Sequence, residues 1–346
     1  MNQPPAISPP DTAGDTTNAL HSTYHHPSFW NAVLPAYDDG ELHVFHEAGI
    51  TIPLIVRSIP RDVRDSSPVY ENLRDVISPY DFAGPLANDK QPNDGWSAFL
   101  AYARRQGWLT AFFRFHPLQT NIQAWSSLPA LDVVPQGRHV VVELGSADTE
   151  GLLTRFKPQV RRDLKVAERA GVQCDLIPLD IEGVGKFHEL YTKTMVRREA
   201  PSFFHFPVSF FENLAGLNTS DAVRVWLLRA DLQGELVSAS ILLIDGSTAF
   251  YFLTGFDYAY RQARPMNAMV YHACRMLPDL NVKQLYLGGG PTGVSDFKSR
   301  FATTMVPFYI GRAVFDHETY DHLCLQYPTS SYFPAYRDPT HATAET

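Results

Sequence analysis

The feature that most constrains the fold is a block of three apolar segments joined by two short glycine turns. The segments cover residues 222–230, 236–243 and 248–254, and Gly234 and Gly246 lie between them. Short connections that contain glycine favour hairpins over longer crossovers. The block therefore predicts three consecutive strands in an antiparallel meander.

The flanking segments predict an α/β protein built from two related halves. The second half shows strand, helix or turn patterns over 140–144, 149–170, 172–179, 181–199, 208–217, 266–277, 284–287, 295–301 and 308–315. The first half is a shorter version, with patterns over 27–37, 43–59, 96–106 and 108–115. Domains of about 100–200 residues are usual, so 346 residues suggest two. We divide the chain into an N-terminal half at 23–138 and a C-terminal half at 139–333, between disordered tails at 1–22 and 334–346.

Charge and cysteine content exclude several classes of protein. Lys plus Arg is 29 and Asp plus Glu is 37, and a net charge of −8 argues against non-specific coating of nucleic acid. The three cysteines are far apart, and the 13 histidines are scattered without metal-ligand spacing. No segment has the 18 or more apolar residues of a membrane span, and the start does not resemble a signal peptide. We expect a cytoplasmic protein without membrane insertion or a metal site.

A glycine-rich turn is the strongest local signal of a binding site. The sequence LGGGPTG at residues 287–293 joins an expected strand to a helical turn at 295–301. Glycines allow positive φ angles and a close approach of the backbone to a ligand. A helix start also offers free N–H groups to an anion. Lys298 is expected in the first turn of that helix, where spacing alone favours a solvated surface lysine over a site residue.

Two further segments combine aromatic and polar residues next to expected turns or strand ends. One is SPYDFAGP at residues 78–85, which contains Tyr80. The other is FRFHPL at residues 113–118, where Arg114 and His116 project on one side of the strand. A basic pair at a strand end can line a site, although an exposed edge is the simpler interpretation.

A basic stretch stands out within this acidic protein. Residues 155–169 contain six basic and two acidic residues, a local charge of +4. Lys157, Arg161, Arg162 and Lys165 belong to it. Such a helix is either a solvated face or a docking surface for phosphates, and the contrast with the net charge keeps both interpretations open.

Together these segments resemble the Fem-type peptidyltransferases, the FemABX group, and their single-chain relatives with an acyl-CoA N-acyltransferase (GNAT) fold. The resemblance covers about residues 24–325. Its motifs, in order, are SPYxFxGP at 78–85, RFHPL at 114–118, KPxxRRDLKxAxxxGV at 157–172, LYxxTMxRR at 190–198, an LxGG…FKxxF block at 287–301 and YIGR at 309–312. A meander followed by a helix and a further strand is also the order of a GNAT sheet.

The resemblance implies an α/β fold of two tandem GNAT-like subdomains, with mixed sheets flanked by helices and an active site in the channel between them. The family transfers an aminoacyl group from aminoacyl-tRNA to an amine. Its catalytic lysine follows a Phe, which places that role on Lys298, after Phe297. It implies no metal and no cofactor besides the donor. Cell-wall members carry a long helical arm that grips the tRNA, and no such coiled coil is visible here.

We assign roles to the remaining candidates on the same basis. Substrate binding is assigned to Phe297, Gly288, Gly289, Gly290, Tyr80, Arg114, His116, Arg197 and Arg198. Docking of tRNA is assigned to Lys157, Arg161, Arg162 and Lys165. Backbone N–H groups near Gly289 and Gly290 would help Lys298 to stabilise the tetrahedral intermediate, and the candidate general bases are Asp81 and Asp296.

The expected function is transfer of an amino acid from aminoacyl-tRNA to an amine, hydroxyl or hydroxylamine of a small-molecule or peptide acceptor, by a monomer acting in natural-product (antibiotic) biosynthesis. Enzymes that use CoA cradle its pyrophosphate with (Q/R)xxGx(G/A). The corresponding residues 261–266 read RQARPM, without either glycine, and Pro265 removes a backbone donor. Arg261 and Arg264 could still bind phosphates by charge. An acyl-CoA-dependent N-acyltransferase, a peptidoglycan bridge aminoacyltransferase and a non-catalytic binding module remain alternatives.

Overall fold

The structure is a computed structural model of the chain. It describes residues 23–87, 92–119, 121–145, 149–219, 223–325, 327, 330 and 332–338. The tail expected at residues 1–22 lies outside this described part. Within the described part, no helix is long and apolar enough to cross a membrane.

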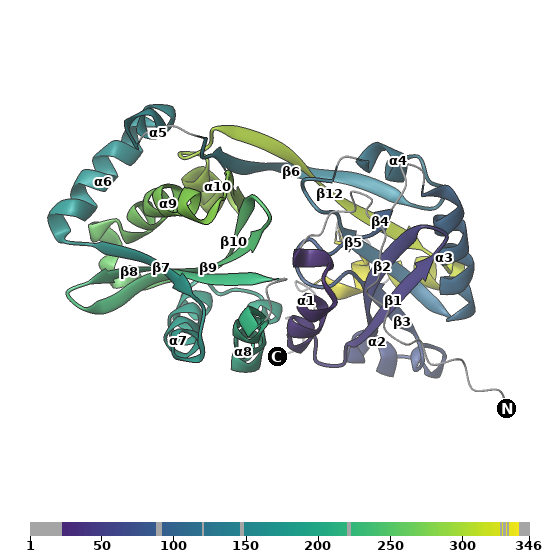
Figure 1. Cartoon of the computed structure of the whole chain (residues 1–346). Coiled ribbons are helices and arrows are strands. Elements are labelled where there is room, and N and C mark those ends of the chain that lie inside the picture. The colour runs from purple at the N-terminus through teal and green to yellow at the C-terminus, as the bar shows by residue number, and fades with distance from the viewer. Residues whose placement is uncertain are drawn as a thin grey trace.

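One mixed sheet of 12 strands runs through both halves of the molecule (Figure 1). Its strand order is β1-β2-β3-β5-β12-β6-β11-β10-β9-β8-β7, and β4 pairs with β2 off this path. The strands are β1 (Glu41–Glu47), β2 (Ile50–Ser58), β3 (Arg74–Ile77), β4 (Leu86–Ala87), β5 (Trp108–Arg114), β6 (Asp132–Glu143), β7 (Gln173–Pro178), β8 (Arg224–Leu232), β9 (Glu235–Asp245), β10 (Thr248–Phe256), β11 (Gln284–Gly288) and β12 (Thr304–Val314). The predicted meander is confirmed, because β8, β9 and β10 pair antiparallel in sequence order.

The last strand, β12, joins the two halves. It pairs antiparallel with β5 of the first half, where Ile310 faces Arg114, and with β6 on its other side, where Ile310 faces Val134. Figure 1 shows the long strands β6 and β12 running side by side from one lobe to the other. The division that we drew after residue 138 falls inside β6, so we propose two lobes of one sheet, not two separate domains.

Helices cover both faces of the sheet. They are α1 (Pro27–Ala32), α2 (Arg61–Asp65), α3 (Asn93–Arg105), α4 (Ile122–Ser126), α5 (Thr149–Arg155), α6 (Pro158–Ala170), α7 (Ile181–Arg197), α8 (Val208–Gly216), α9 (Pro265–Met276), α10 (Thr292–Lys298) and α11 (His317–Cys324). In the second half α7 and α8 lie below the sheet and α6 and α9 above it (Figure 1). The longest of these helices, α7, has 17 residues, so the described part of the chain contains no long coiled-coil arm.

An apolar core continues from one half to the other on the face that carries α7 and α8. It contains Phe29 of α1, Phe210 of α8, Phe250 of β10 and Ile310 of β12, all at most 5% exposed. Burial of large side chains contributes roughly 1.5–3 kcal/mol each. This shared core stabilises the arrangement of the two lobes as well as each lobe by itself.

Several local predictions are confirmed and others are wrong. Pro158 separates α5 from α6, and Gly171 ends α6 with a φ of 81°. The connection expected at 128–137 is wrong, because β6 already begins at Asp132 and pairs with β12 despite the loop-like residues in it. Lys298 is the last residue of α10 and not in the first turn of a helix, because that helix starts earlier, at Thr292.

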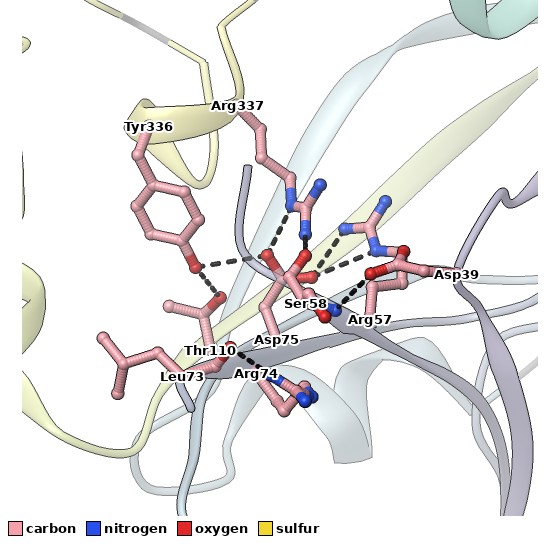
Figure 2. Close-up of polar contacts among 9 residues, drawn as sticks. All are labelled: Asp39, Arg57, Ser58, Leu73, Arg74, Asp75, Thr110, Tyr336 and Arg337. Atoms are coloured by element: carbon pink, nitrogen blue, oxygen red, sulfur yellow. Dashed lines mark hydrogen bonds and ion pairs between the residues drawn. The ribbon is translucent and has the colours of Figure 1, made fainter. Parts of the chain in front are cut away.

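The expected disordered tail from residue 334 is also wrong for its described part, Pro334–Asp338. A short 3-10 helix, η8 (Ala335–Arg337), packs against the first half, and Tyr336 is 3% exposed. Figure 2 shows the reason: the guanidinium of Arg337 forms an ion pair with the buried carboxylate of Asp75. Asp75 also pairs with Arg57 at 2.8 Å.

The Asp75 cluster predicts a specific loss of stability. Asp75→Ala leaves the two part-buried guanidinium groups of Arg57 and Arg337 without their counter-charge, which we expect to cost about 3–5 kcal/mol of unfolding free energy. Urea unfolding followed by circular dichroism measures the change. Asp65→Ala is the matched control, because its pair with Arg61 is exposed and we expect no measurable effect. Equal losses in the two variants would contradict the role assigned to Asp75.

Candidate active site

A cavity of about 240 Å³ lies where the two halves meet. Both halves contribute to its wall: Asp81 follows β3 and Arg114 ends β5, whereas Tyr286 and Gly288 belong to β11. Lys298, at the end of α10, also lines it. Titratable side chains from segments far apart in sequence therefore converge on one small, partly enclosed space.

Lys298 is a half-buried cation in this cavity. Its Nζ donates a hydrogen bond to the carbonyl oxygen of Gly289 at 2.6 Å. Burial lowers its pKa to about 8, while the nearby carboxylate of Asp81 acts in the opposite direction and Arg198 adds to the lowering. At neutral pH most of the Lys298 side chains therefore keep their proton, and the ammonium is only partly hydrated.

Asp81 is the acidic partner in the same wall. Its backbone has a φ of 67°, which is unusual for a non-glycine residue, and one carboxylate oxygen accepts a hydrogen bond from the Tyr24 hydroxyl at 2.9 Å. Burial raises its pKa to about 7, although Tyr24, Arg114 and Lys298 all favour the charged form. A carboxyl group with a pKa this close to neutral can accept and return a proton.

The glycine turn brings the backbone close to an imidazole ring. A Cβ atom at Gly289 would lie 2.6 Å from the ring of His139. That ring is held in place, because it stacks on Phe308 at 4.5 Å between centroids and is hydrogen-bonded to the Tyr286 hydroxyl. Burial and the charge of Lys298 lower the pKa of His139 to about 4, so it is neutral at physiological pH.

The structure brings together only some of the residues that we assigned to substrate binding. Arg114 and the three glycines Gly288, Gly289 and Gly290 line the cavity with Lys298. His116 does not, because it is 3% exposed and packs behind the cavity wall, 5.4 Å from the Phe250 ring. Burial lowers the pKa of His116 to about 3.

Two aromatic candidates pack beside the cavity instead of lining it. The ring of Tyr80 lies 5.1 Å from the ring of Phe206 and 5.5 Å from that of Phe252. These rings belong to an aromatic cluster that also contains Phe210 of α8. Phe297 packs on Phe301, 5.5 Å away, against the core on the other face. Both residues support the wall. Sequence reasoning missed His139, Tyr286 and Phe250, for which no motif gave a signal.

The two arginines at the end of α7, Arg197 and Arg198, are exposed. Arg197 covers the ring of Tyr258 at 4.6 Å, and Arg261 covers the same ring at 4.7 Å. The charge of Arg198 lowers the pKa of Lys298, so that arginine lies within electrostatic reach of the cavity. Neither arginine lines the cavity.

Lys157, directly before α6, and the basic residues of α6 form an exposed surface that begins close to Lys298. Lys157, Arg161, Arg162 and Lys165 are all exposed. The Nζ of Lys157 donates to the hydroxyl of Ser299 at 3.3 Å, directly after Lys298 in the chain. This helix therefore carries a row of positive charge away from the edge of the cavity.

Comparisons with known proteins agree with this architecture. Residues 154–299 match the family described as "Acetyltransferase (GNAT) domain". FemX is similar in structure, with a TM-score of 0.59 and 13% identity over 85% of this chain and 92% of FemX. L-PGS from Bacillus licheniformis has a TM-score of 0.57 and 11% identity over 88% of this chain and 96% of its own.

A third structure, the C-terminal domain (DUF2156) of a candidate lysylphosphatidylglycerol synthetase from Agrobacterium fabrum, has a TM-score of 0.55. It is 14% identical over 86% of this chain and 89% of its own. No curated protein sequence matches this one. The chain thus has a Fem-like GNAT fold, as its motifs predicted, and the GNAT domain supports an acyltransferase.

The close packing at Gly289 yields a prediction. Gly289→Ala places a methyl group against the fixed His139 ring, so we expect a loss of about 1–3 kcal/mol in stability, typical of overpacking. Thermal denaturation measures it as a lower Tm. Gly293→Ala is the matched control, because a Cβ there meets open space within α10. A Gly289→Ala protein as stable as the control would show that His139 can move aside.

Proposed function

We propose that the protein transfers an aminoacyl group from aminoacyl-tRNA to an amine of a small-molecule or peptide acceptor. The observation that carries this proposal is that the Lys298 ammonium and the Asp81 carboxyl line the same cavity, beside a helix with exposed basic residues. An aminoacyl ester is already activated, so the enzyme needs mainly to position the reactants and stabilise charge. Positioning alone can supply roughly 7–11 kcal/mol of the barrier.

In the proposed reaction the acceptor nitrogen attacks the ester carbon, and the carbonyl oxygen becomes an oxyanion. The Lys298 ammonium, held by the Gly289 carbonyl, stabilises that charge. Asp81 accepts the proton that the attacking nitrogen loses. When the intermediate collapses, the C–O bond to the ribose breaks and the ribose oxygen leaves with that proton, which returns Asp81 to its starting form.

The helix start that follows the meander favours a tRNA donor over CoA. Arg264 has a left-handed φ of 56° directly before α9, and Pro265 is the first residue of that helix. Pro265 has no N–H to offer, so a backbone cradle for pyrophosphate lacks one donor. Arg264 is further engaged in an ion pair with Asp163 of α6 at 3.3 Å.

Transfer from acyl-CoA is the second candidate, because residues 154–299 match a domain described as an acetyltransferase. The donor experiment separates the two. The purified protein is incubated with a mixture of charged tRNAs or with acetyl-CoA, and binding and acyl transfer to a panel of amines are measured. Transfer from acetyl-CoA alone would reject the proposal, and binding of neither donor would favour a non-catalytic module.

The basic helix α6 supplies a variant for the same experiment. Reversing the charge of Arg161 and Arg162 should weaken tRNA binding at low salt, because binding to phosphates releases counterions. Unchanged affinity at low salt would count against α6 as the docking surface. We further propose that the acceptor belongs to natural-product biosynthesis and, because the proposed donor is a charged tRNA, that the reaction takes place in the cytoplasm.

Lys298 should be required for the chemical step. Lys298→Ala should fold normally but lower the single-turnover transfer rate by about 10²–10³, the usual loss for one oxyanion donor. Lys283→Ala is the control, because Lys283 is exposed and does not line the cavity. A rate within a few-fold of the unmodified protein would reject the role of Lys298.

The two pKa values predict a narrow pH optimum. Transfer needs Asp81 ionised, so kcat/KM should rise with pH through about 7, and it needs Lys298 protonated, so kcat/KM should fall above about 8. Asp81→Asn should lower the rate and remove the acidic limb. Measurement of kcat/KM from pH 6 to 9 tests both limbs. With an acceptor amine that is already unprotonated over this pH range, an acidic limb that persists in Asp81→Asn would exclude Asp81 as the base.

A further inference from the structure

A second cavity, of about 520 Å³, lies between the start of β6 and the residues from the end of β12 to Phe333. Arg312 of β12 and Asp132 of β6 line it, together with His317 and Tyr320 of α11 and Phe333. Its size is typical of a site for a small molecule. Arg312 belongs to the YIGR motif, which the proposed transfer reaction does not use.

Among the residues that line this cavity, Arg312 has an unusual environment for a cation. Its guanidinium carbon lies 5.7 Å from the centre of the Phe333 ring, so an aromatic face covers one side of the cation. Its Nε is buried and has no hydrogen-bond partner among the described residues. Among the described residues Arg312 also forms no ion pair, although Asp132 lies opposite it on the paired strand β6. A buried N–H group without an acceptor is costly, which points to a missing hydrogen-bond partner at Nε.

The surrounding residues define the chemistry of that partner. A guanidinium prefers the paired oxygens of a carboxylate or phosphate. Tyr320 lies 5.8 Å from Phe333, so two aromatic rings stand beside the cation and offer a surface to a flat or apolar group. Asp132 is exposed and disfavours a second negative charge on the cavity side of β6.

The contacts of Asp75 with Tyr336 and Arg337 help to hold Phe333 in the wall of this cavity. Phe333 precedes the segment that Tyr336 and Arg337 anchor to Asp75 (Figure 2). The Phe333 ring also stacks on Phe112 of β5 at 6.4 Å, next to Arg312 in the sheet. The aromatic face is therefore part of a fixed structure, as expected of a site that exists before its ligand arrives.

We propose that the Arg312 cavity binds a small molecule that carries an oxyanion, a carboxylate or a phosphate, on a ring. This site is separate from the Lys298 cavity. Phe308, which lines that cavity, and Arg312 are four residues apart on β12, a distance of about 13 Å along a strand. The inference does not depend on the proposed aminoacyl transfer.

Titration of the full-length protein with simple probes tests the proposal. The probes are benzoate, phenyl phosphate and the neutral benzamide, and the readout is the ¹H–¹⁵N signal of the Arg312 Nε–H, identified by its absence in Arg312→Lys. We expect a saturable shift with at least one of the two anions and none with benzamide. The benzoate and phenyl phosphate arms distinguish a carboxylate ligand from a phosphate ligand.

Two variants make the result decisive. Asp132→Asn removes a neighbouring negative charge at an exposed position and should tighten anion binding by roughly threefold. Arg104→Gln, at an exposed position of α3, should leave binding unchanged. No shift with either anion, an equal shift with benzamide, or weaker binding in Asp132→Asn would overturn the proposal.

Discussion

The hydrogen-bond ladders on the two edges of β12 are the constraint on which the rest of the structure depends. β12 pairs with β5 on one edge and with β6 on the other, so two lobes become one sheet. Both cavities follow from this pairing, because β12 contributes Phe308 to one and Arg312 to the other. A hinge between independent domains would not keep Arg114 and Lys298 facing the same small space.

Within that space, opposing electrostatic effects produce two groups with pKa values near neutral. Burial disfavours the charged forms of both Lys298 and Asp81, whereas their mutual attraction favours them. Burial is the larger effect for each residue. A neutral His139 lies beside Lys298 and adds no competing charge at physiological pH. The fold thus places one cationic and one acidic side chain, each with a pKa near neutral, in the same cavity.

Local sequence patterns predicted the parts of the fold that depend on local interactions. The meander, the break at Pro158 and the helix stop at Gly171 follow from turn and helix chemistry. The start of β6 did not, because the residue that pairs with Asp132, Arg312 of β12, lies about 180 residues away, and this pairing outweighs the loop-like local sequence. The same applies to His139 and Tyr286, which only the sheet brings next to Lys298, and to Arg337, whose partner Asp75 lies in the first half.

The ion pair between Arg337 and Asp75 has a consequence for synthesis of the chain on the ribosome. Asp75 and Arg57 are translated before β12, and Arg337 follows Asp75 by 262 residues. Until these later residues have been translated, the first lobe has an unpaired β5 edge and lacks part of its charge cluster. Exposed strand edges invite aggregation in nascent chains. Production of this protein should accordingly benefit from chaperones that shield the incomplete lobe.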